Sequence, residues 1–553
     1  MKALAADHSF ERSRRAAPRY TRRGGGGHRL RARVCGFQVL SILGAIFVLA
    51  GHGAAQKGAP PDVSSDDVAQ GSATFARVFG AIEESYVDPI DPEQTIFNGA
   101  IRGMLAKLDP FSAFFDRDQF EMLKEQARGQ ALGFGSILYV QTGKVVVLQT
   151  AQGSPSGRAG LGPGDEIVEV NGTRINRLDF QSLVELLQRS RSQPVRLGVI
   201  HPGRVVSQDY ELKPAEVALP TIDKAFVLRS GIGYVHISGF EQKTPQEVID
   251  AIGRLGGSDP EGLKGLLLDL RDNHGGIVDS AVATASLFLK PDVVVLTVRD
   301  RARTRKTYRT APMPSHFDVP LVVLVNGETA SAAELLTAAL QDHDRALIAG
   351  QPTYGKGVVE SVIGLSESTG LALTTGQYFT PSGRSIQRPL PDTMLAVADS
   401  SETIAFHTDD GRSVSAEGGI TPDVSIPPRP LDPWVTFLNQ RGVFTTFASD
   451  YLSLHGKLDR SFEPDKKTLG EFKDFLTREG ISAPDEYWGA DQDYLRLRIK
   501  AEIMTLVYGL ALGDEIETQN DPQVEEAAKL FPKVPALLKP AAKPLTARRS
   551  RSQ

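Results

Sequence analysis

The pattern of apolar and polar positions divides the first half of the chain into two structural classes. From 73 to 129, apolar residues recur at the three- and four-residue spacing of an amphipathic helix, as in Phe75 and Val78. From 130 to 214, the pattern changes to short β-rich runs bounded by glycines. The chain therefore predicts a helical N-terminal domain followed by a small β-rich domain.

The second half alternates between strand and helix and then becomes helical. Within 215–430, strand-like runs such as 265–270 and 321–325 are each followed by a helical run, which is typical of an α/β domain. Residues 431–538 return to helical spacing, whereas 539–553 are rich in proline, alanine and arginine and predict a disordered tail.

The N-terminus has the composition of an export segment. Residues 1–33 are basic, and 34–55 form an apolar stretch that ends in small residues. This order predicts either a cleaved signal peptide or a retained anchor through 34–50, because ~17 apolar residues just span a bilayer. Both alternatives place the bulk of the chain outside the cytoplasm. Residues 56–72 are small and polar and predict a linker.

Composition limits the cofactors and partners. The net charge of −5 gives no general attraction to nucleic acid. The single cysteine, Cys35, excludes an internal disulfide and a cysteine-based metal site, and no H-E-x-x-H zinc signature occurs. We therefore expect no metal, no cofactor and no nucleic-acid partner.

The segment 326–334 (NGETASAAE) joins a predicted buried strand to a helix that begins with small residues. The hydroxyl of Ser331 would lie near the free N–H groups of the helix start, which can stabilise an oxyanion. A serine at such a junction is also a common helix N-cap. Position alone therefore leaves Ser331 as either a nucleophile or a cap.

The segment 350–357 (GQPTYGKG) resembles a phosphate-binding P-loop but departs from it. Gly357 replaces the hydroxyl residue that binds Mg²⁺, and the strand-like run 358–363 follows where a helix is needed. The glycines on both sides of Lys356 allow a bend that would bury its amine, and desolvation suits a lysine to act as a base toward a serine. The alternative is a solvated surface lysine.

One histidine has a comparable choice of roles. His343 lies between two aspartates where the helical run after Ser331 ends. We expect it to be a cation that stabilises the helix C-terminus, with a triad histidine as the alternative.

Together these segments resemble the C-terminal processing (tail-specific) peptidases, serine peptidase family S41. The resemblance runs from about Phe75 to about Pro428. It is carried, in order, by LRDNHGG (270–276), NGETASAAE (326–334), TYGKG (353–357), YFTPSGRSIQ (378–387) and GITPD (419–423).

The resemblance implies a multidomain α+β fold. The β-rich module would be a PDZ domain, a small β-barrel-like sandwich, and the α/β domain would be a protease core with crotonase-like ββα repeats. The implied segments are a helical N-terminal domain (73–129), the PDZ domain (130–214), the protease core (215–430) and a helical C-terminal region (431–538).

The resemblance also implies the chemistry of an exported serine endopeptidase. Ser331 would attack the scissile carbonyl, Lys356 would take its proton, and water would hydrolyse the acyl-enzyme. The oxyanion hole would be formed by the backbone N–H of Ala332 and of one glycine in the pair Gly275 and Gly276.

The PDZ-like module predicts the substrate class. Gly133, Phe134, Gly135 and Ser136 stand where PDZ domains bind a terminal carboxylate, with the peptide added as a β-strand. The alternative is that these glycines only form a turn. The expected substrates are polypeptides with apolar C-terminal tails, in the periplasm or at the extracytoplasmic face of the inner membrane. The resemblance leaves open whether the protein has an activating adaptor and whether it forms a homo-oligomer.

Three positions depart from the family pattern. His274 replaces proline and Phe111 replaces histidine, and we expect little effect from either. Glu360 replaces a glutamine that helps to position the lysine. A carboxylate there would favour the ammonium form of Lys356, unless burial protonates it. Contact also needs a bend, because residues four apart in an extended strand are ~13 Å apart. The alternative function is therefore a catalytically impaired PDZ scaffold or adaptor.

Overall fold

The structure is a computed structural model that describes residues 65–127, 130–218, 220–256, 262–302, 304–313, 316–391, 393–395, 405–416 and 418–538. The predicted basic segment 1–33, the export segment 34–55 and the tail 539–553 lie outside these residues. No helix in the described part of the chain has the length and apolar character needed to cross a bilayer.

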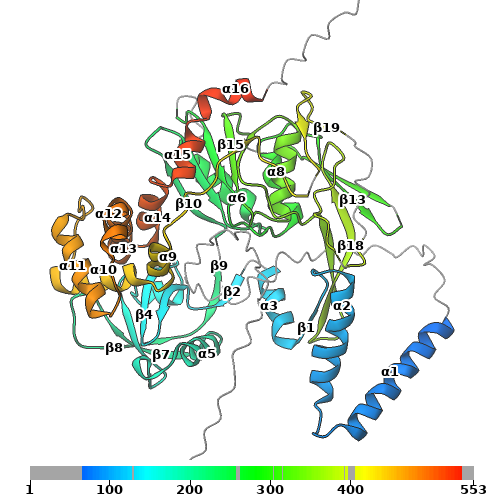
Figure 1. The fold of residues 1–553 in the computed structure, drawn as a ribbon, viewed down its shortest axis with the longest axis horizontal. Coiled ribbons are helices and arrows are strands. Elements are labelled where there is room, and N and C mark those ends of the chain that lie inside the picture. Colours follow the sequence, from blue (N-terminus) through cyan, green and yellow to red (C-terminus); the bar gives the residue numbers. More distant parts are fainter. Residues whose placement is uncertain are drawn as a thin grey trace, which may run out of the picture.

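The N-terminal domain is helical, as predicted, with one strand near its end. Its elements are α1 (Ser65–Ser85), η2 (Gln94–Ile101), α2 (Arg102–Leu108), β1 (Ala113–Phe115) and α3 (Arg117–Ala127). The predicted linker 56–72 is wrong for residues 65–72, because α1 begins at Ser65 with Asp66 and Asp67 in its first turn, where acidic side chains favour a helix. The apolar stripe of α1 is exposed, at 46% for Phe75 and 55% for Val78, and Figure 1 shows α1 apart from the body.

The main sheet of the β-rich module is antiparallel, in the order β3-β4-β5-β7-β8, with β6 (Thr173–Arg174) beside β5. The strand β3 is therefore an edge strand. The strand β2 (Gln130–Gly133), which ends at Gly133, instead pairs with β9 (Ala215–Ala218) in a separate two-stranded sheet. The main sheet packs on α5, whose Leu183 is fully buried. The bounds are β3 (Ser136–Gln141), β4 (Lys144–Thr150), β5 (Glu166–Val170), α5 (Phe180–Ser190), β7 (Val195–Ile200) and β8 (Gln208–Leu212).

The α/β domain is built on a six-stranded sheet in the order β10-β11-β12-β15-β16-β21. Only β10 is antiparallel to its neighbour. One face packs on α6, α7 and α8, which confirms the predicted alternation of strands and helices. The bounds are β10 (Ile222–Val227), β11 (Gly233–Ile237), α6 (Thr244–Arg254), β12 (Leu266–Asp269), α7 (Val278–Ser286), β15 (Leu321–Val325), α8 (Ala332–Asp342), β16 (Leu347–Gly350) and β21 (Val424–Ser425).

A second sheet connects the N-terminal domain to this core. Strand β18 pairs antiparallel with β17 along one edge and with β1 and β13 along the other, and β14 follows β13. The N-terminal domain thus contributes a strand to the core. The bounds are β13 (Val294–Asp300), β14 (Arg305–Arg309), β17 (Val358–Gly364) and β18 (Gly370–Phe379).

The C-terminal helices join the two larger modules. Helices α10, α11 and α13 form one apolar cluster with Tyr139, Val146 and Leu148 of the β-rich module. Helices α15 and α16 cover the second face of the core sheet (Figure 1). The bounds are α9 (Pro433–Gln440), α10 (Val443–His455), α11 (Lys466–Arg478), α12 (Asp485–Ala490), α13 (Gln492–Tyr508), α14 (Leu510–Thr518), α15 (Pro522–Ala528) and α16 (Val534–Leu537).

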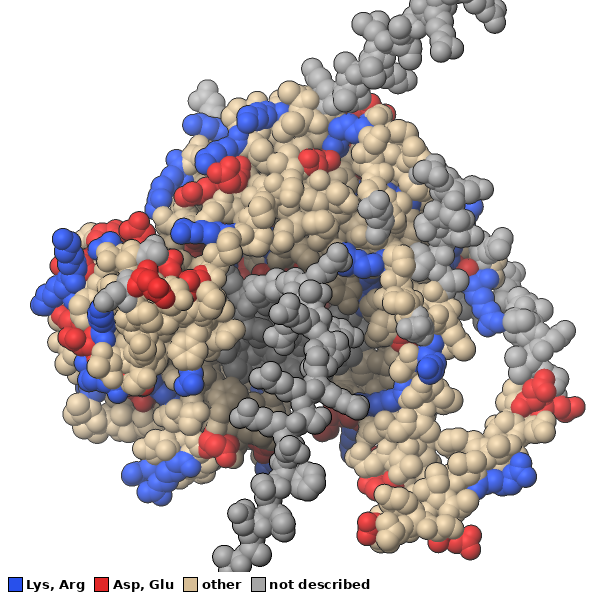
Figure 2. Space-filling view, viewed as in Figure 1, with Lys and Arg blue, Asp and Glu red and all other residues tan. Residues whose placement is uncertain are grey.

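Charge is mixed on the face that Figure 2 shows. Basic and acidic side chains are interspersed over the C-terminal helices at the left of the view. This distribution agrees with the small net charge of −5.

Candidate active site

The loops that carry the candidate residues meet at one edge of the core sheet. Segments 270–277, 326–331 and 351–357 follow β12, β15 and β16, which are adjacent and parallel. The carboxyl ends of parallel strands lie at the same edge, where α/β folds place their sites. Backbone hydrogen bonds join the loops directly, from Ala330 N to Asn273 O at 2.9 Å and from Tyr354 N to Thr329 O at 3.0 Å.

Ser331 lies at the sharp turn between β15 and α8. It is the N-cap of α8 and has φ +55° and ψ −120°, a conformation that side-chain-bearing residues rarely adopt. Such a backbone costs on the order of 1–3 kcal/mol, which the surrounding packing must offset. Its Oγ is buried and has no hydrogen-bond partner among the described residues. Ser331 and Glu334 thus have the arrangement of a capping box, but Oγ makes no cap hydrogen bond of regular geometry.

The glycine pair of the neighbouring loop lies against this turn. Gly275 has φ +101°, and a Cβ there would lie 2.9 Å from Ser331 Cβ and 3.0 Å from Ala332 N, so only glycine fits. The N–H of Gly275 donates to Asn273 Oδ1 at 2.8 Å. The N–H groups of Ala332 and Gly276 have no acceptor in the part of the chain that the structure describes. These two N–H groups are the ones available to an oxyanion.

Lys356 is buried, with its side chain 5% exposed, and is not a solvated surface lysine. Its Nζ donates to Glu360 Oε2 at 2.6 Å. The required bend is present, because Lys356 precedes β17 and the strand register shifts between Val359 and Glu360. The carboxylate therefore contacts the amine directly, although the two residues are four apart.

The surroundings of Glu360 have opposing effects on its pKa. Burial raises the pKa of Glu360 to about 7, although the neighbouring Lys356 lowers it. Asp109 of the N-terminal domain also raises this pKa through its negative charge. Burial thus favours the protonated carboxyl of Glu360, whereas its contact with Lys356 favours the charged form.

The loop between α2 and β1 also reaches Lys356. Asp109 Oδ1 accepts hydrogen bonds from the backbone N–H of Phe111 and Ser112, at 2.8 and 2.7 Å. The loop is tied to β18 by the bond from Thr374 N to Ser112 Oγ at 3.2 Å. The ring of Phe111 faces the amine, with Lys356 Nζ 5.0 Å from the ring centre. Phe111 was predicted to be a departure of little effect, and its position at the lysine was not predicted.

One buried carboxylate connects the two candidate residues. Glu334 Oε2 accepts from the backbone N–H of both Ser331 and Lys356, each at 2.9 Å. Its Oε1 accepts from Thr353 Oγ1 at 2.6 Å and from Gly355 N at 2.7 Å. Burial raises the pKa of Glu334, and these four hydrogen bonds oppose that effect. The role of Glu334 was not predicted, although the sequence shows Ser331 and Glu334 at the spacing of a capping box.

The candidate peptide-binding loop lies at the open edge of the β-rich sheet. Gly135 has φ +76°, and Ser136 begins the edge strand β3. Phe134 packs in the same apolar cluster as Leu183 and Leu187 of α5. Among the described residues, β3 pairs with β4 alone, so its other edge carries no strand beside this glycine turn.

Other candidate residues take structural positions. His343 caps the C-terminus of α8, as predicted, with Nδ1 2.7 Å from Asp409 Oδ2 and Nε2 2.7 Å from Val294 O. Neither ring nitrogen is left for Ser331. The run after Lys356 is the strand β17, so the segment 350–357 is not a P-loop.

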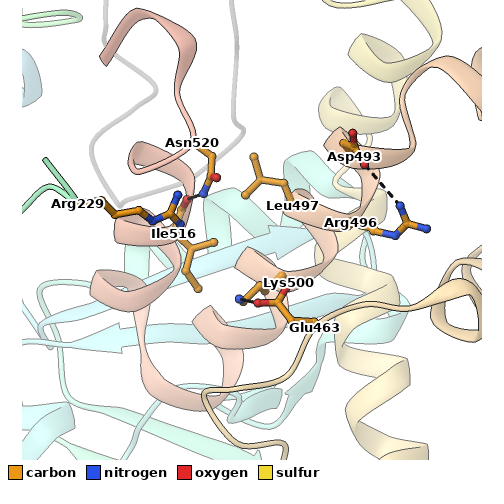
Figure 3. Close-up of a pocket in the computed structure, with 8 residues that line it drawn as sticks. All are labelled: Arg229, Glu463, Asp493, Arg496, Leu497, Lys500, Ile516 and Asn520. Atoms are coloured by element: carbon orange, nitrogen blue, oxygen red, sulfur yellow. Dashed lines mark hydrogen bonds and ion pairs between the residues drawn. The ribbon is translucent and has the colours of Figure 1, made fainter. Parts of the chain in front are cut away.

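A polar cavity lies elsewhere, at the junction of the C-terminal helices with the core (Figure 3). It is bordered by Arg229 of the core and by residues of α13 and α14, and the Arg496–Asp493 pair lies at one end. None of the residues around Ser331 lines it. Within the described ranges no cluster of His, Cys, Asp and Glu has the arrangement of a metal site.

Comparison with protein families gives three matches. The profile of peptidase family S41 matches residues 231–395, that of a PDZ domain matches 146–200, and that of the activating protease CtpB N-terminal domain matches 52–119. These matches confirm the predicted succession of a helical N-terminal domain, a PDZ domain and an α/β peptidase core.

Individual relatives agree with these matches. The carboxy-terminal-processing protease of Bartonella bacilliformis is 32% identical over 317 residues, which are 57% of this chain and 72% of that protein. The carboxyl-terminal-processing protease of Synechocystis sp. is 32% identical over 314 residues, with 56% and 72% covered. Among solved structures, the photosystem II D1 C-terminal processing protease is 27% identical, with a TM-score of 0.36 and with 66% of this chain and 94% of that chain covered.

Proposed function

The chain belongs to peptidase family S41 and is a C-terminal processing protease, and from that premise we propose that Ser331 is its nucleophile and Lys356 its general base. The observation that carries the proposal is the position of Glu334. Its Oε2 binds the backbone N–H of both residues, so a single buried carboxylate fixes the loop of the nucleophile to the loop of the base.

The proposed reaction follows from the groups around Ser331. The hydroxyl attacks the scissile carbonyl while the neutral amine of Lys356 takes its proton. The N–H groups of Ala332 and Gly276 stabilise the oxyanion, and the N–H of Gly275 stays bound to Asn273. Lys356 then protonates the leaving amine. In the second half, the amine activates the water that hydrolyses the acyl-enzyme.

The PDZ domain would select the substrate. An apolar C-terminal tail would add as a strand beside β3, and its carboxylate would bind the turn formed by Gly133, Phe134, Gly135 and Ser136. The open edge of β3 and its proximity to α5 support this mode. The substrates are then polypeptides with apolar C-terminal tails.

Export is part of the proposal and is supported by composition. The basic segment 1–33 and the apolar segment 34–55 have the order of a signal peptide or anchor. The enzyme would therefore act in the periplasm or at the extracytoplasmic face of the inner membrane.

One observation favours a second candidate function. The 2.6 Å contact between Lys356 and Glu360 stabilises the ammonium form of the lysine, which cannot accept a proton. A chain in which that form dominates would bind tails through its PDZ domain without cleaving them efficiently. It would then act as a PDZ scaffold or adaptor.

Cleavage of an unfolded reporter with an apolar C-terminus separates the two functions. We expect the wild type to cleave it and Ser331→Ala and Lys356→Ala each to lose at least about a thousandfold in kcat/KM. Ser366→Ala and Lys306→Ala, at exposed positions, are the matched controls. Calorimetric binding of the tail peptide is measured alongside. A wild type that binds the tail but cleaves no reporter at any pH would establish the scaffold instead.

A further inference from the structure

Arg271 connects the loop beside Ser331 to the C-terminal helical region. It follows β12, in the segment that leads to Gly275 and Gly276. On one side, its Nε lies 3.0 Å and its Nη2 2.6 Å from Asp269 Oδ2. On the other side, its Nη1 lies 3.0 Å from Asp521 Oδ2 and 3.0 Å from Gln523 Oε1.

The two C-terminal partners stand at the start of α15. Asp521 is the N-cap of this helix, and its Oδ1 accepts from Gln523 N at 2.8 Å. The same carboxylate therefore caps the helix through one oxygen and binds Arg271 through the other. Gln523 Nε2 also donates to Ile426 O at 2.7 Å. Behind these contacts, Val524 and Ala527 are buried against the core sheet.

The neighbouring part of the junction is polar. Gln519 bonds to the backbone of Arg229 and Val227 at 3.1 and 3.2 Å. Beside it lies the cavity of Figure 3, which Arg229, Ile516 and Asn520 border. The polar contacts of Asp521 and Gln523 therefore add to the apolar packing of Val524 in fixing this end of α15 to the core.

Hydrogen bonds hold Arg271, Asp272, Asn273 and Gly275 in the segment that leads to the glycine pair. Arg271 O lies 3.0 Å from His236 Nε2. Asp272 has φ +61° and is bound by Asn326, which accepts from its N–H at 3.1 Å and donates to its Oδ1 at 2.8 Å. Asn273 then binds Gly275 N and, through its Nδ2, Ile237 O at 2.8 Å. A left-handed conformation at an aspartate relaxes when its supports are removed.

On its buried side, Arg271 forms an ion pair with Asp269. Burial alone would raise the pKa of Asp269, but Arg271 brings it to about 2, so the carboxylate stays charged. Tyr234 also donates to Asp269 Oδ2 at 2.7 Å. Arg271 is thus anchored in the core on one side, and its second side depends on the C-terminal region.

We propose that Arg271 is a positioning residue for the peptidase reaction, and that Asp521 and Gln523 hold it so that the turn of Gly275 and Gly276 receives the oxyanion. The inference rests on the proposed role of Ser331 and that turn. It gives the C-terminal helices a part in the reaction in addition to packing. The C-terminal helices would thus fix the position of the oxyanion-binding turn through the guanidinium of Arg271.

The test compares Asp521→Asn with Asp521→Glu in the full chain. Asparagine still caps α15 but loses the charge that holds Arg271. On a short peptide without a PDZ-binding tail, we expect Asp521→Asn to lower kcat about tenfold with KM within twofold, less than the loss of an oxyanion donor. Asp521→Glu keeps the charge and should recover most of the loss. Asp465→Asn, at the N-cap of α11 where the side chain binds only within its own helix turn, is the matched control.

A second measurement does not depend on activity. Hydrogen exchange of the amides 272–276, measured in the Ser331→Ala background, should be faster with Asp521→Asn and unchanged with Asp465→Asn. Unchanged exchange, a kcat within twofold of the wild type, or an equal loss in Asp465→Asn would each overturn the inference. Cleavage that survives in Ser331→Ala alone would instead overturn the proposed nucleophile. The exchange experiment would still decide whether the contacts of Arg271 with Asp521 and Gln523 stabilise the loop 272–276.

Discussion

The amine of Lys356 lies 2.6 Å from Glu360 Oε2, and the two side chains are only 5% and 2% exposed. A buried ion pair is held together more tightly than an exposed one, because little water screens it. The proposed base therefore has a proton-retaining partner within hydrogen-bond distance. The protonation of this pair should decide how fast the protease works at a given pH.

Glu360→Gln should increase activity at neutral pH. Glutamine can accept the same hydrogen bond from the amine but carries no charge that stabilises the ammonium. We expect kcat/KM to rise about tenfold near pH 7 and the acidic limb of its pH profile to move to lower pH. The measurement is a full pH–rate profile on a short peptide.

Glu328→Gln is the matched control for this substitution. Glu328 lies in the loop before Ser331 and its side chain is 36% exposed, 3.9 Å from His274 rather than against the lysine. It should leave the profile unchanged. A Glu360→Gln profile that coincides with the wild type would show that Glu360 already carries the proton and imitates an amide.

Phe111→Leu should also increase kcat/KM, but less than Glu360→Gln, because the contact that it removes from Lys356 is weaker. The ring centre lies 5.0 Å from Lys356 Nζ, a distance at which a cation–π attraction amounts to ~0.5–2 kcal/mol. Leucine fills similar space without that attraction. We expect kcat/KM below neutral pH to rise about two- to fivefold.

Phe114→Leu is the control for Phe111→Leu, since Phe114 lies on β1 and stacks on Phe97 instead. Both variants remove a ring from the N-terminal domain, but only Phe111 faces the amine. Equal changes in the two variants would attribute the effect to packing and not to the ring at Lys356.

Local patterns were enough to predict the positions of the two candidate residues. The strand 321–325 is a continuous apolar run before small residues, and it forms β15 with the same bounds. Lys356 precedes the strand β17 as the pattern 358–363 predicts. Such features depend on neighbours in the sequence.

The partners of these residues depend on tertiary contacts that no local pattern contains. The contact of Glu360 needs the register shift beside Val359, which the alternation of the strand does not show. Phe111 reaches Lys356 because β1 pairs with β18, a pairing across two domains. Helical spacing likewise predicted a helical region over 431–538, but not its division into helices or the surfaces they cover, since an apolar stripe does not specify its partner.

Gly442→Ala should loosen the PDZ domain from the C-terminal helices. Gly442 has φ +62°, and a Cβ there would lie 2.1 Å from the Tyr139 hydroxyl, which donates to Gly442 O at 3.0 Å. We expect a destabilisation about 1–3 kcal/mol beyond the backbone strain alone, as for other overpacked sites. Hydrogen exchange of β3 and thermal unfolding report the change.

Gly456→Ala separates strain from collision. Gly456 ends the same helix with φ +74°, but no atom lies within 4 Å of its added Cβ. Both variants carry the strain of alanine at positive φ, and only Gly442→Ala meets Tyr139. Faster exchange of β3 in both variants would show that the collision with Tyr139 is not what loosens the PDZ domain from the C-terminal helices.

Glu241→Gln should stabilise the protein at high pH but not at low pH. Glu241 Oε2 is buried without a hydrogen-bond partner among the described residues, and it follows Phe240, whose carbonyl binds Ile277 N. Burial and then the charge of Glu247 raise the pKa of Glu241 from 4.5 to about 7. The folded state therefore holds this proton more tightly than the unfolded state. The contribution of the protonated Glu241 carboxyl to the free energy of unfolding is complete below pH 4.5 and is lost as pH rises through 7.

Because ionisation of Glu241 destabilises the folded state, the stability difference between Glu241→Gln and the wild type should increase with pH. Glutamine imitates the protonated carboxyl at every pH, so the free energy of unfolding of Glu241→Gln should equal the wild type near pH 4.5 and exceed it by up to about 3 kcal/mol at pH 8. Denaturant unfolding at a series of pH values measures it. Glu211→Gln, on the exposed side of β8, controls for the loss of one negative charge. A stability difference that does not change with pH would mean that Glu241 meets enough water or an unrecognised donor in the folded state to ionise normally.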